Sequence, residues 1–385
     1  MKILIAPDSF KGTFSAKQVA SFMAKGVKKI YPHSQIKIMP MADGGEGTIE
    51  AVVFDLKGKI ISKNVTGPLG YKVKAKYAFV YDKTHHQHLA FIEMAEAAGL
   101  TLVHESKRNP LYTTTYGVGE LIFDAIKRGA KEIIVGIGGS ATNDAGCGMA
   151  QALGVEFLNK DGESVNHNAF MCGKLLSDVR VIDTSNVSPK LKKIKFLVAC
   201  DVSNPLYGRH GAAHIYAHQK GASKSEVKFL DKALRNIANA HNKSKVASLP
   251  GSGAAGGLGF GLRAFCNAKL ESGVEIISEI LNLKEVIKKS DLIITGEGRL
   301  DKQSMHNKAP VGIAKIAKRY RKKIIAVPGS VGHGYEKTYK YFDVILPTAT
   351  GKYTHKELIQ YTPKLVEEAV VKALGKLADK NKSGR

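Results

Sequence analysis

The sequence predicts an α/β protein with a doubly wound parallel sheet and a second, mixed α/β domain inserted into the first. Seven short runs rich in β-branched residues each end at Asp, Gly, Ser or Pro, and near-continuous apolar runs of this kind are typical of strands buried on both faces. Helical patterns follow several of the runs, an alternation that indicates a parallel sheet covered by helices. The runs are Ile3–Ala6, Ile36–Met39, Ile133–Gly136, Phe196–Ala199, Leu292–Thr295, Ile324–Val327 and Val344–Leu346.

Residue types that commonly begin helices predict three of the helices between these runs. Ser15 is a residue type that caps helices, and Asn and Asp residues follow the third run before another apolar stretch. The expected helices run from Ser15 to about Lys29, from Asn143 or Asp144 to Leu153, and over Pro310–Arg319.

A different pattern marks the inserted domain. Polar and apolar residues alternate along Lys72–Tyr81, and we expect a partner strand over His88–Glu93. This pattern predicts an antiparallel sheet with one solvent-exposed face. We therefore expect a discontinuous first domain over residues 1–60 and 288–385, an inserted domain over 61–287, and an active-site cleft between them.

The composition of the chain restricts the kinds of protein that it can be. The chain has 385 residues, 44% of them hydrophobic, and no apolar run approaches the ~18 residues of a membrane span. The first apolar run is shorter than the ~7–15 residues of a signal-peptide core, so we expect a cytoplasmic protein that does not bind membranes. The formal charge is +24, with 58 Lys and Arg against 34 Asp and Glu. That charge raises nucleic acid as a partner, but the basic residues are spread along the chain, which favours a surface that attracts small anions.

A glycine-rich turn follows the run at Ile133. It reads G-I-G-G-S-A-T-N-D, and glycines let the backbone approach a ligand, while a helix N-terminus attracts anions. Asp144 is in position to orient Mg²⁺. A tight turn that merely caps a helix is the alternative. The candidate ligand-binding residues of this turn are Gly138, Gly139, Ser140, Thr142 and Asn143.

Acidic and basic residues also follow other predicted strands. Asp43 would lie at the carboxyl end of a strand, where it can accept a hydroxyl proton, although helix capping would explain it too. Lys11 follows the first run and can meet a carboxylate or phosphate, and Arg299 can grip a carboxylate with two hydrogen bonds. Asp201 ends the fourth run. We expect these groups to converge on one edge of one sheet.

Two further segments bear on the chemistry. Glu297 and Asp301 flank Arg299 and could hold metal or water. The G-S-G-A-A-G segment from Gly251 matches a dinucleotide fingerprint, but Pro250 and a helical stretch precede it instead of a strand. We interpret it as a flexible loop that closes over phosphates through Gly256 and Gly257. A true fingerprint would indicate an NAD-dependent reductase of a hydroxy acid, which is the alternative enzyme.

Taken together and in order, ten segments resemble the type I glycerate kinase family. They cover nearly the whole chain. They are A-P-D-S-F-K-G from Ala6, P-M-A-D-G-G-E-G-T from Pro40, V-T-G-P-L-G from Val65, I-E-M-A-E-A-A-G-L from Ile92, R-N-P-L-Y-T-T-T-Y-G from Arg108, G-I-G-G-S-A-T-N-D from Gly136, A-C-D-V-S-N-P-L from Ala199, Q-K-G-A from Gln219, G-A-A-G-G-L-G from Gly253 and I-T-G-E-G-R-L-D from Ile294.

The resemblance implies phosphorylation of D-glycerate by ATP with Mg²⁺, on a Rossmann-like domain that carries an inserted domain. The 2-phosphoglycerate product is favoured over 3-phosphoglycerate, and a homodimer is left open. The residues carried over as cleft residues are Asp8, Lys11, Asp43, the Gly138–Asp144 turn, Asp201 and Arg299.

These expectations combine into one mechanism. Lys11 or Arg299 meets the carboxylate of glycerate, and Asp43 accepts the hydroxyl proton during transfer of the γ-phosphoryl group. Whether the Gly138–Asp144 turn holds ATP or glycerate stays open at this point. The candidate ligands of Mg²⁺ are Asp144, Asp201 and Asp301.

Overall fold

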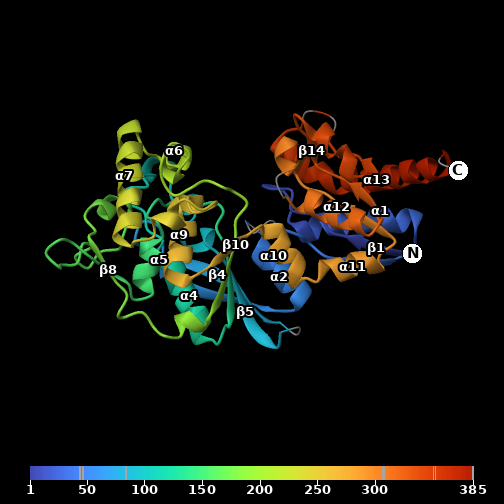
Figure 1. The fold of residues 1–385 in the computed structure, drawn as a ribbon. Coiled ribbons are helices and arrows are strands. Elements are labelled where there is room, and N and C mark those ends of the chain that lie inside the picture. The colour runs from blue at the N-terminus through green and yellow to red at the C-terminus, as the bar shows by residue number, and fades with distance from the viewer. Residues whose placement is uncertain are drawn as a thin grey trace. The chain divides into compact units, whose positions relative to one another are not determined.

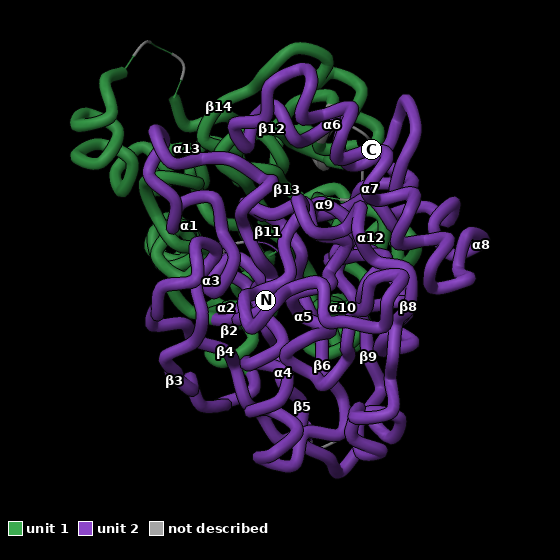
Figure 2. The backbone as a smooth tube through the Cα atoms, turned by 90° about the vertical axis from the view of Figure 1, so that its left-hand side faces the viewer, with its two compact units in different colours: residues 1–43, 50–55, 274–385 green, residues 44–49, 56–273 purple. Residues whose placement is uncertain are grey.

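The computed structural model describes residues 1–42, 45, 47–82, 85–305, 308–349, 351 and 353–383. The chain forms two compact units, coloured separately in Figure 2. Unit 1 contains residues 1–43, 50–55 and 274–385, and unit 2 contains residues 44–49 and 56–273. Helix α2 (Thr48–Leu56) contributes residues to both units.

Unit 1 is built on a five-stranded parallel sheet. Its strand order is β15-β13-β11-β1-β2, so the chain passes from β1 to the edge strand β2 and later returns to the other side of β1 to add β11, β13 and β15. A small parallel pair, β12 with β14, lies outside this sheet. The strands are β1 (Lys2–Ile5), β2 (Gln35–Ile38), β11 (Leu292–Thr295), β12 (Arg299–Leu300), β13 (Lys323–Ala326), β14 (Ser330–Val331) and β15 (Val344–Ile345).

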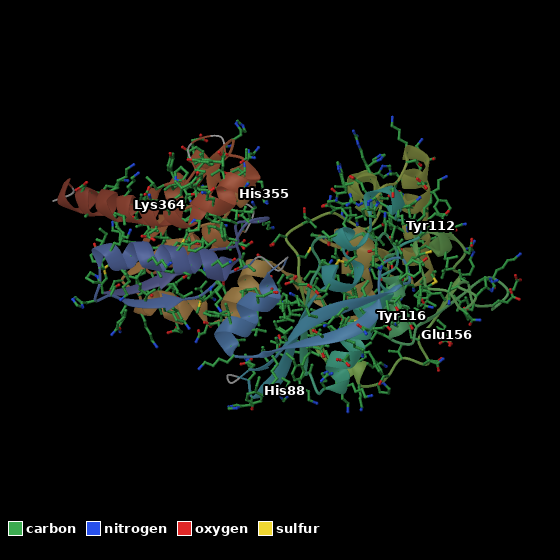
Figure 3. All side chains as sticks on the ribbon, turned by 180° about the vertical axis from the view of Figure 1, so that it is seen from behind. His88, Tyr112, Tyr116, Glu156, His355 and Lys364 are labelled. Atoms are coloured by element: carbon green, nitrogen blue, oxygen red, sulfur yellow. The ribbon has the colours of Figure 1, made fainter. Side chains whose placement is uncertain are left out.

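Helices cover both faces of the unit 1 sheet, as expected for a doubly wound fold (Figure 1). Ile3 and Ile5 of β1 join the core cluster that contains the apolar residues of α1 and α13. Leu4 is fully buried and alternates to the opposite face, on which α11 and α12 contact the sheet. The helices are α1 (Ala16–Ile30), α10 (Gly273–Ile280), α11 (Leu283–Lys289), α12 (Ala309–Arg319) and α13 (His355–Ser383), whose first residue is labelled in Figure 3.

The first predicted helix is confirmed together with its cap. Ser15 is the N-cap of α1, and its side chain accepts a hydrogen bond from the backbone N–H of Gln18. The Gln18 side chain in turn accepts from the backbone N–H of Ser15, which completes a capping box. Such a box satisfies two backbone donors that the first helical turn leaves unpaired.

Unit 2 contains a six-stranded mixed sheet with the order β10-β9-β6-β5-β4-β3. The predicted antiparallel pairing is confirmed, because β4 pairs antiparallel with both β3 and β5, while β5, β6, β9 and β10 are parallel neighbours. The strands are β3 (Lys59–Thr66), β4 (Lys72–Asp82), β5 (Gln87–Glu93), β6 (Glu132–Gly136), β9 (Lys195–Ala199) and β10 (Lys269–Glu271), with a separate pair β7 (Glu156–Leu158) and β8 (Val181–Asp183).

Two apolar clusters support unit 2. One joins the sheet to α4 and α9, and the other joins α5, α6, α7 and α9. Figure 1 shows α6 and α7 as neighbours, in agreement with their contacts. The helices are α3 (Ala95–Ala98), α4 (Tyr116–Lys127), α5 (Cys147–Ala152), α6 (Ala212–Tyr216), α7 (Lys224–Ala240), α8 (Ser244–Ala247) and α9 (Ala254–Cys266).

All seven predicted runs form strands, but the expectation of one shared sheet edge is wrong. β6 and β9 belong to the mixed sheet of unit 2, and the other five belong to the unit 1 sheet. The division of the chain also differs from the expected bounds, since Val274 lies in unit 1, where its side chain packs directly against Gly312 of α12. Within the described residues, no helix combines the length and apolarity needed to cross a membrane.

Candidate active site

The sheet of unit 1 has a topological switch point between β1 and β11. β2 continues the sheet on one side of β1, and β11, β13 and β15 extend it on the other. In open parallel sheets, ligands bind outside the carboxyl ends of the strands at such a point, because the loops there diverge and leave a crevice. The loops that follow β1 and β11 are therefore the first place to look for a ligand site.

A pocket of about 420 Å³ lies at this point. Asp8, Lys11 and Arg299, three residues singled out from the sequence, line it together. Its wall also includes apolar and hydroxyl side chains. The complete lining is Asp8, Ser9, Phe10, Lys11, Thr13, Glu297, Gly298, Arg299, Lys308, Gly329, Ser330, Thr348, Ala349, Gly351, Tyr353, Leu358 and Thr362.

Backbone hydrogen bonds hold the loops of the pocket together. The Asp8 N–H donates to the Gly296 carbonyl at 2.8 Å, and the Gly329 N–H donates to the Glu297 carbonyl at 2.9 Å. A side chain on Gly298 would lie 3.3 Å from the Phe10 Cα atom, so the loops after β1 and β11 approach closely there. Their charged groups are thus presented from a fixed framework.

Glu297 is the most unusual group in the pocket. Its side chain is buried, and its Oε2 accepts a hydrogen bond from Lys308 Nζ at 3.2 Å. Its Oε1 has no hydrogen-bond partner among the described residues. Burial raises the pKa of Glu297, and the Lys308 ammonium and Ser304 hydroxyl offset only part of that rise.

Only one member of this pair was expected from the sequence. Glu297 was expected to hold metal or water, and Lys308 was missed, because a lysine before an Ala-Pro helix start looks like an ordinary solvated residue. Arg299 is 66% exposed in its side chain, and its Nε lies 3.8 Å from an Asp301 carboxylate oxygen. Three cations, Lys11, Arg299 and Lys308, therefore line the pocket with two acids.

The glycine-rich turn after β6 lies in unit 2 and is arranged differently from the expectation. Gly138 and Gly139 are exposed, whereas Ser140, Thr142 and Asn143 are buried. The helix predicted from Asn143 or Asp144 begins only at Cys147, because Ala145 and Gly146 adopt positive φ angles of 55° and 72°. A carboxylate side chain of the protein itself accepts the backbone hydrogen bonds at the start of this short helix.

That anion is the Asp144 carboxylate. It accepts hydrogen bonds from the N–H and hydroxyl of Thr115 at 2.8 and 2.7 Å, from the Gly146 N–H at 3.1 Å and from the Gly148 N–H at 3.2 Å. Burial raises the pKa of Asp144, and these hydrogen bonds oppose the rise. A fully buried carboxylate with four donors has a structural role, so we withdraw it from the candidate Mg²⁺ ligands.

Lys220 places a cation beside the same turn; it lies in the Q-K-G-A segment but was not among the expected site residues. Its Nζ donates to the Ser140 hydroxyl at 2.6 Å and to the Thr142 carbonyl at 2.7 Å. The side chain is almost completely buried, and this burial lowers its pKa to about 7, with the charge of Asp144 acting in the opposite direction. Groups whose pKa is strongly shifted by burial cluster at functional sites.

Further buried polar atoms surround this lysine. Thr142 Oγ1 and both amide atoms of Asn143 lack hydrogen-bond partners within the part of the chain that the structure describes. An unsatisfied buried polar group costs about 1–3 kcal/mol, so native proteins usually supply it with water or a ligand. The turn therefore keeps unused hydrogen-bonding capacity next to its two exposed glycines.

Gly256 and Gly257 do not form the flexible phosphate cover expected from their sequence. Both are buried, with φ angles of 66° and 93°. A Cβ atom on Gly256 would lie 1.9 Å from the Thr142 carbonyl oxygen, and one on Gly257 would lie 2.7 Å from the Ala145 Cα atom. These glycines let α9 pack against the 142–145 turn.

The remaining candidates have separate positions. Asp201 follows β9 in unit 2 and is exposed, and Asp301 follows β12 in unit 1 with its side chain 21% exposed. Asp43 lies outside the described residues. The described residues contain no group of three His, Cys, Asp or Glu side chains arranged around a metal. Mg²⁺ commonly uses only one or two carboxylates together with substrate phosphates. Asp201 in unit 2 and Asp301 in unit 1 can each supply one such carboxylate within its own unit.

Comparisons with known proteins define the class. The model of the glycerate kinase family matches residues 3–377. A glycerate kinase of Halalkalibacterium halodurans is 45% identical over 371 residues, 95% of this chain and 96% of that protein. A glycerate 2-kinase of Escherichia coli K12 is 48% identical over 335 residues, 86% of each chain. The chain thus belongs to the glycerate kinase family and is an enzyme of that class.

A solved structure agrees with this assignment. It comes from Salmonella typhimurium LT2, is provisionally named glycerate kinase 2, and superposes with a TM-score of 0.89 at 40% identity over 99% of both chains. The predicted α/β fold and the resemblance to the family are confirmed. The alternatives of an NAD-dependent reductase and a nucleic-acid binder gain no support from these relatives.

Proposed function

We propose that the enzyme transfers the γ-phosphoryl group of ATP to the 2-hydroxyl of D-glycerate. The family supports glycerate as the acceptor, and the name of the Escherichia coli relative favours the 2-position. The observation that carries the proposal is the unit 1 pocket, where Lys11, Arg299 and Lys308 line one cavity at the switch point of a parallel sheet. Cations in a partly enclosed pocket attract anions such as a carboxylate or a phosphate.

We assign the carboxylate of D-glycerate to Arg299, with Lys11 as the second cation. A guanidinium presents its donors in a planar fork that matches the two oxygens of a carboxylate. Asp8 lies beside this pair and accepts a hydrogen bond from the Ser9 N–H at 2.6 Å, which fixes the carboxylate side chain at the pocket wall. Asp43, which the sequence predicts as the proton acceptor, lies outside the described residues, and Glu297 of this pocket is a second candidate for that role.

Asp201 of unit 2 and Asp301 of unit 1 each remain a candidate to hold Mg²⁺. Both offer carboxylate oxygens, which this hard cation prefers, and neither is fully buried. When bound, Mg²⁺ supplies positive charge to the phosphates. The turn at Gly138 and Gly139, with Lys220 behind it, is the corresponding anion-binding candidate of unit 2.

One experiment tests both the acceptor and the position of transfer. Purified enzyme is incubated with D-glycerate, ATP and Mg²⁺, and the product is followed by proton-coupled ³¹P NMR. Phosphate on the 2-hydroxyl is next to a single proton and gives a doublet, whereas phosphate on the 3-hydroxyl is next to a CH₂ group and gives a triplet. We expect the doublet. A triplet would reverse the positional assignment, and no new signal would refute the proposed reaction.

Arg299→Lys provides a test of the pocket itself. It keeps the charge but loses the fork, so we expect the KM for D-glycerate to rise by about tenfold or more, with a smaller effect on the KM for ATP. Arg319→Lys, at the end of α12, is the matched control and leaves both constants unchanged. An equal KM for D-glycerate in Arg299→Lys and wild type would remove Arg299 from the carboxylate site.

A further inference from the structure

Glu297 combines three properties that set it apart from the other acids of unit 1. It lines the pocket, it is buried, and its Oε1 has no hydrogen-bond partner among the described residues. The other oxygen, Oε2, is held by Lys308 at 3.2 Å. The side chain is therefore fixed at one oxygen and has unused accepting capacity at the other.

The chemistry of this oxygen limits what can bind it. A phosphate or carboxylate would repel it, because both are anionic. A metal ion would lie near the Lys308 ammonium, which already neutralises the Glu297 carboxylate and would repel a second cation. A neutral group that donates a hydrogen bond avoids both penalties. The hydroxyl of a hydroxy acid is such a group.

The rest of the pocket fits the remainder of that substrate. Arg299 and Lys11 line the same cavity and can hold a carboxylate, while Glu297 supplies the acceptor. A three-carbon acid fills only part of about 420 Å³, so the cavity retains room for a phosphoryl group. The pocket thus contains complementary groups for the carboxylate and one hydroxyl of D-glycerate.

We propose that Glu297 binds the 2-hydroxyl of D-glycerate and accepts its proton during phosphoryl transfer, an inference that rests on the proposed function. The hydroxyl oxygen forms a bond to the γ-phosphorus of ATP, and its proton passes to Glu297 Oε1. The bond between the γ-phosphorus and the bridging oxygen breaks, and ADP leaves with the electron pair. Lys308 is a positioning residue that orients the carboxylate and favours its ionised form.

The electrostatics of the pocket are consistent with this role. Burial raises the pKa of Glu297, and Lys308 opposes that rise, so the group is a stronger base than an exposed glutamate but retains a partner for its charge. The other charged groups of the pocket are Asp8, Lys11 and Arg299, and Asp301 raises the pKa of Glu297 through space.

Glu297→Gln is the direct test. Glutamine has nearly the same shape and keeps a carbonyl acceptor, but it cannot take a proton. We expect kcat to fall by roughly 10²–10⁴-fold, with the KM values for D-glycerate and ATP changed by less than about threefold. Glu285→Gln is the matched control, because the Glu285 side chain on α11 is 45% exposed and pairs with Lys288 outside the pocket; its kcat should equal that of the wild type.

Lys308→Met separates positioning from simple structural support. Without the ammonium, the pKa of Glu297 rises further, so the acidic limb of the kcat/KM profile moves to higher pH. A purely structural lysine would lower activity without moving this limb. If Glu297→Gln does not fold, as judged by circular dichroism, Glu297→Asp and the Lys308→Met profile still decide the question.

Several outcomes overturn the inference while leaving the proposed function intact. One is a Glu297→Gln enzyme whose kcat is within about threefold of the wild type. Another is a loss confined to the KM for ATP, which would place a ribose hydroxyl on Glu297. A third is a Lys308→Met profile whose acidic limb coincides with that of the wild type. Failure of the wild-type enzyme to phosphorylate D-glycerate would instead refute the proposed function.

Discussion

Replacement of Lys220 by methionine should change how the stability of the enzyme depends on pH. Burial lowers the pKa of Lys220 from 10.5 to about 7, and a change of this size corresponds to about 5 kcal/mol of destabilisation of the charged form. Between these two pH values, the unfolded chain binds a proton on this amine that the folded chain does not bind. The free energy of unfolding contributed by Lys220 therefore rises with pH across that window.

The magnitude follows from the same linkage. From pH 6.5 to pH 8.5, the wild-type enzyme should gain about 2 kcal/mol relative to Lys220→Met, because each pH unit above the folded pKa contributes about 1.4 kcal/mol. Methionine keeps an unbranched side chain of similar size without the charge. Other titrating groups are common to both proteins, so their contributions cancel in the difference.

Guanidinium unfolding followed by circular dichroism is the suitable assay, because the chain has no Trp to report on unfolding by fluorescence. Lys228→Met, at an exposed position of α7, is the control and should give a difference that does not vary with pH. If the stability difference between wild type and Lys220→Met stays constant within about 0.5 kcal/mol, Lys220 does not titrate as its burial implies.

Two further substitutions test the unit 2 turn. Asp144→Asn replaces an acceptor of four hydrogen bonds by a group with a single acceptor oxygen, so we expect a loss of about 3 kcal/mol in unfolding free energy, against no change for the exposed Asp161→Asn. Equal midpoints for these two variants would contradict the structural role. Gly256→Ala places a Cβ atom 1.9 Å from the Thr142 carbonyl oxygen. Gly162 also has a positive φ, but a Cβ atom there would meet no neighbour, so Gly162→Ala should lower the unfolding free energy by only about 1 kcal/mol. Gly256→Ala should lower it by much more in the same denaturation assay. Equal losses for the two variants would show that the 142–145 turn moves to accommodate the new Cβ atom.

The elements that the sequence predicts well are those with local signals. Strand β11 is an unbroken apolar run from Leu292 to Thr295, and α1 has its complete capping box within Ser15–Gln18. The alternation along β4 likewise identifies its antiparallel pairing. Each of these signals lies within a few residues of the element that it predicts.

The partners of each element were not predictable in the same way. β6 and β11 are both fully buried, and burial on both faces does not record which sheet a strand joins. The same limit applies to the site. Asp144 resembles a ligand until the donors of Thr115 are known, and Lys220 meets Ser140 across 80 residues of sequence.

The discontinuity of unit 1 has a consequence for biosynthesis. β1 is released early from the ribosome, but its parallel neighbour β11 is made only after residues 56–273 have emerged. Unit 2 is continuous over that stretch and can complete its core while β1 and β2 still lack the other three strands of their sheet. Unit 2 can thus fold before unit 1 is complete, and until then β1 has an open strand edge, a feature that favours aggregation.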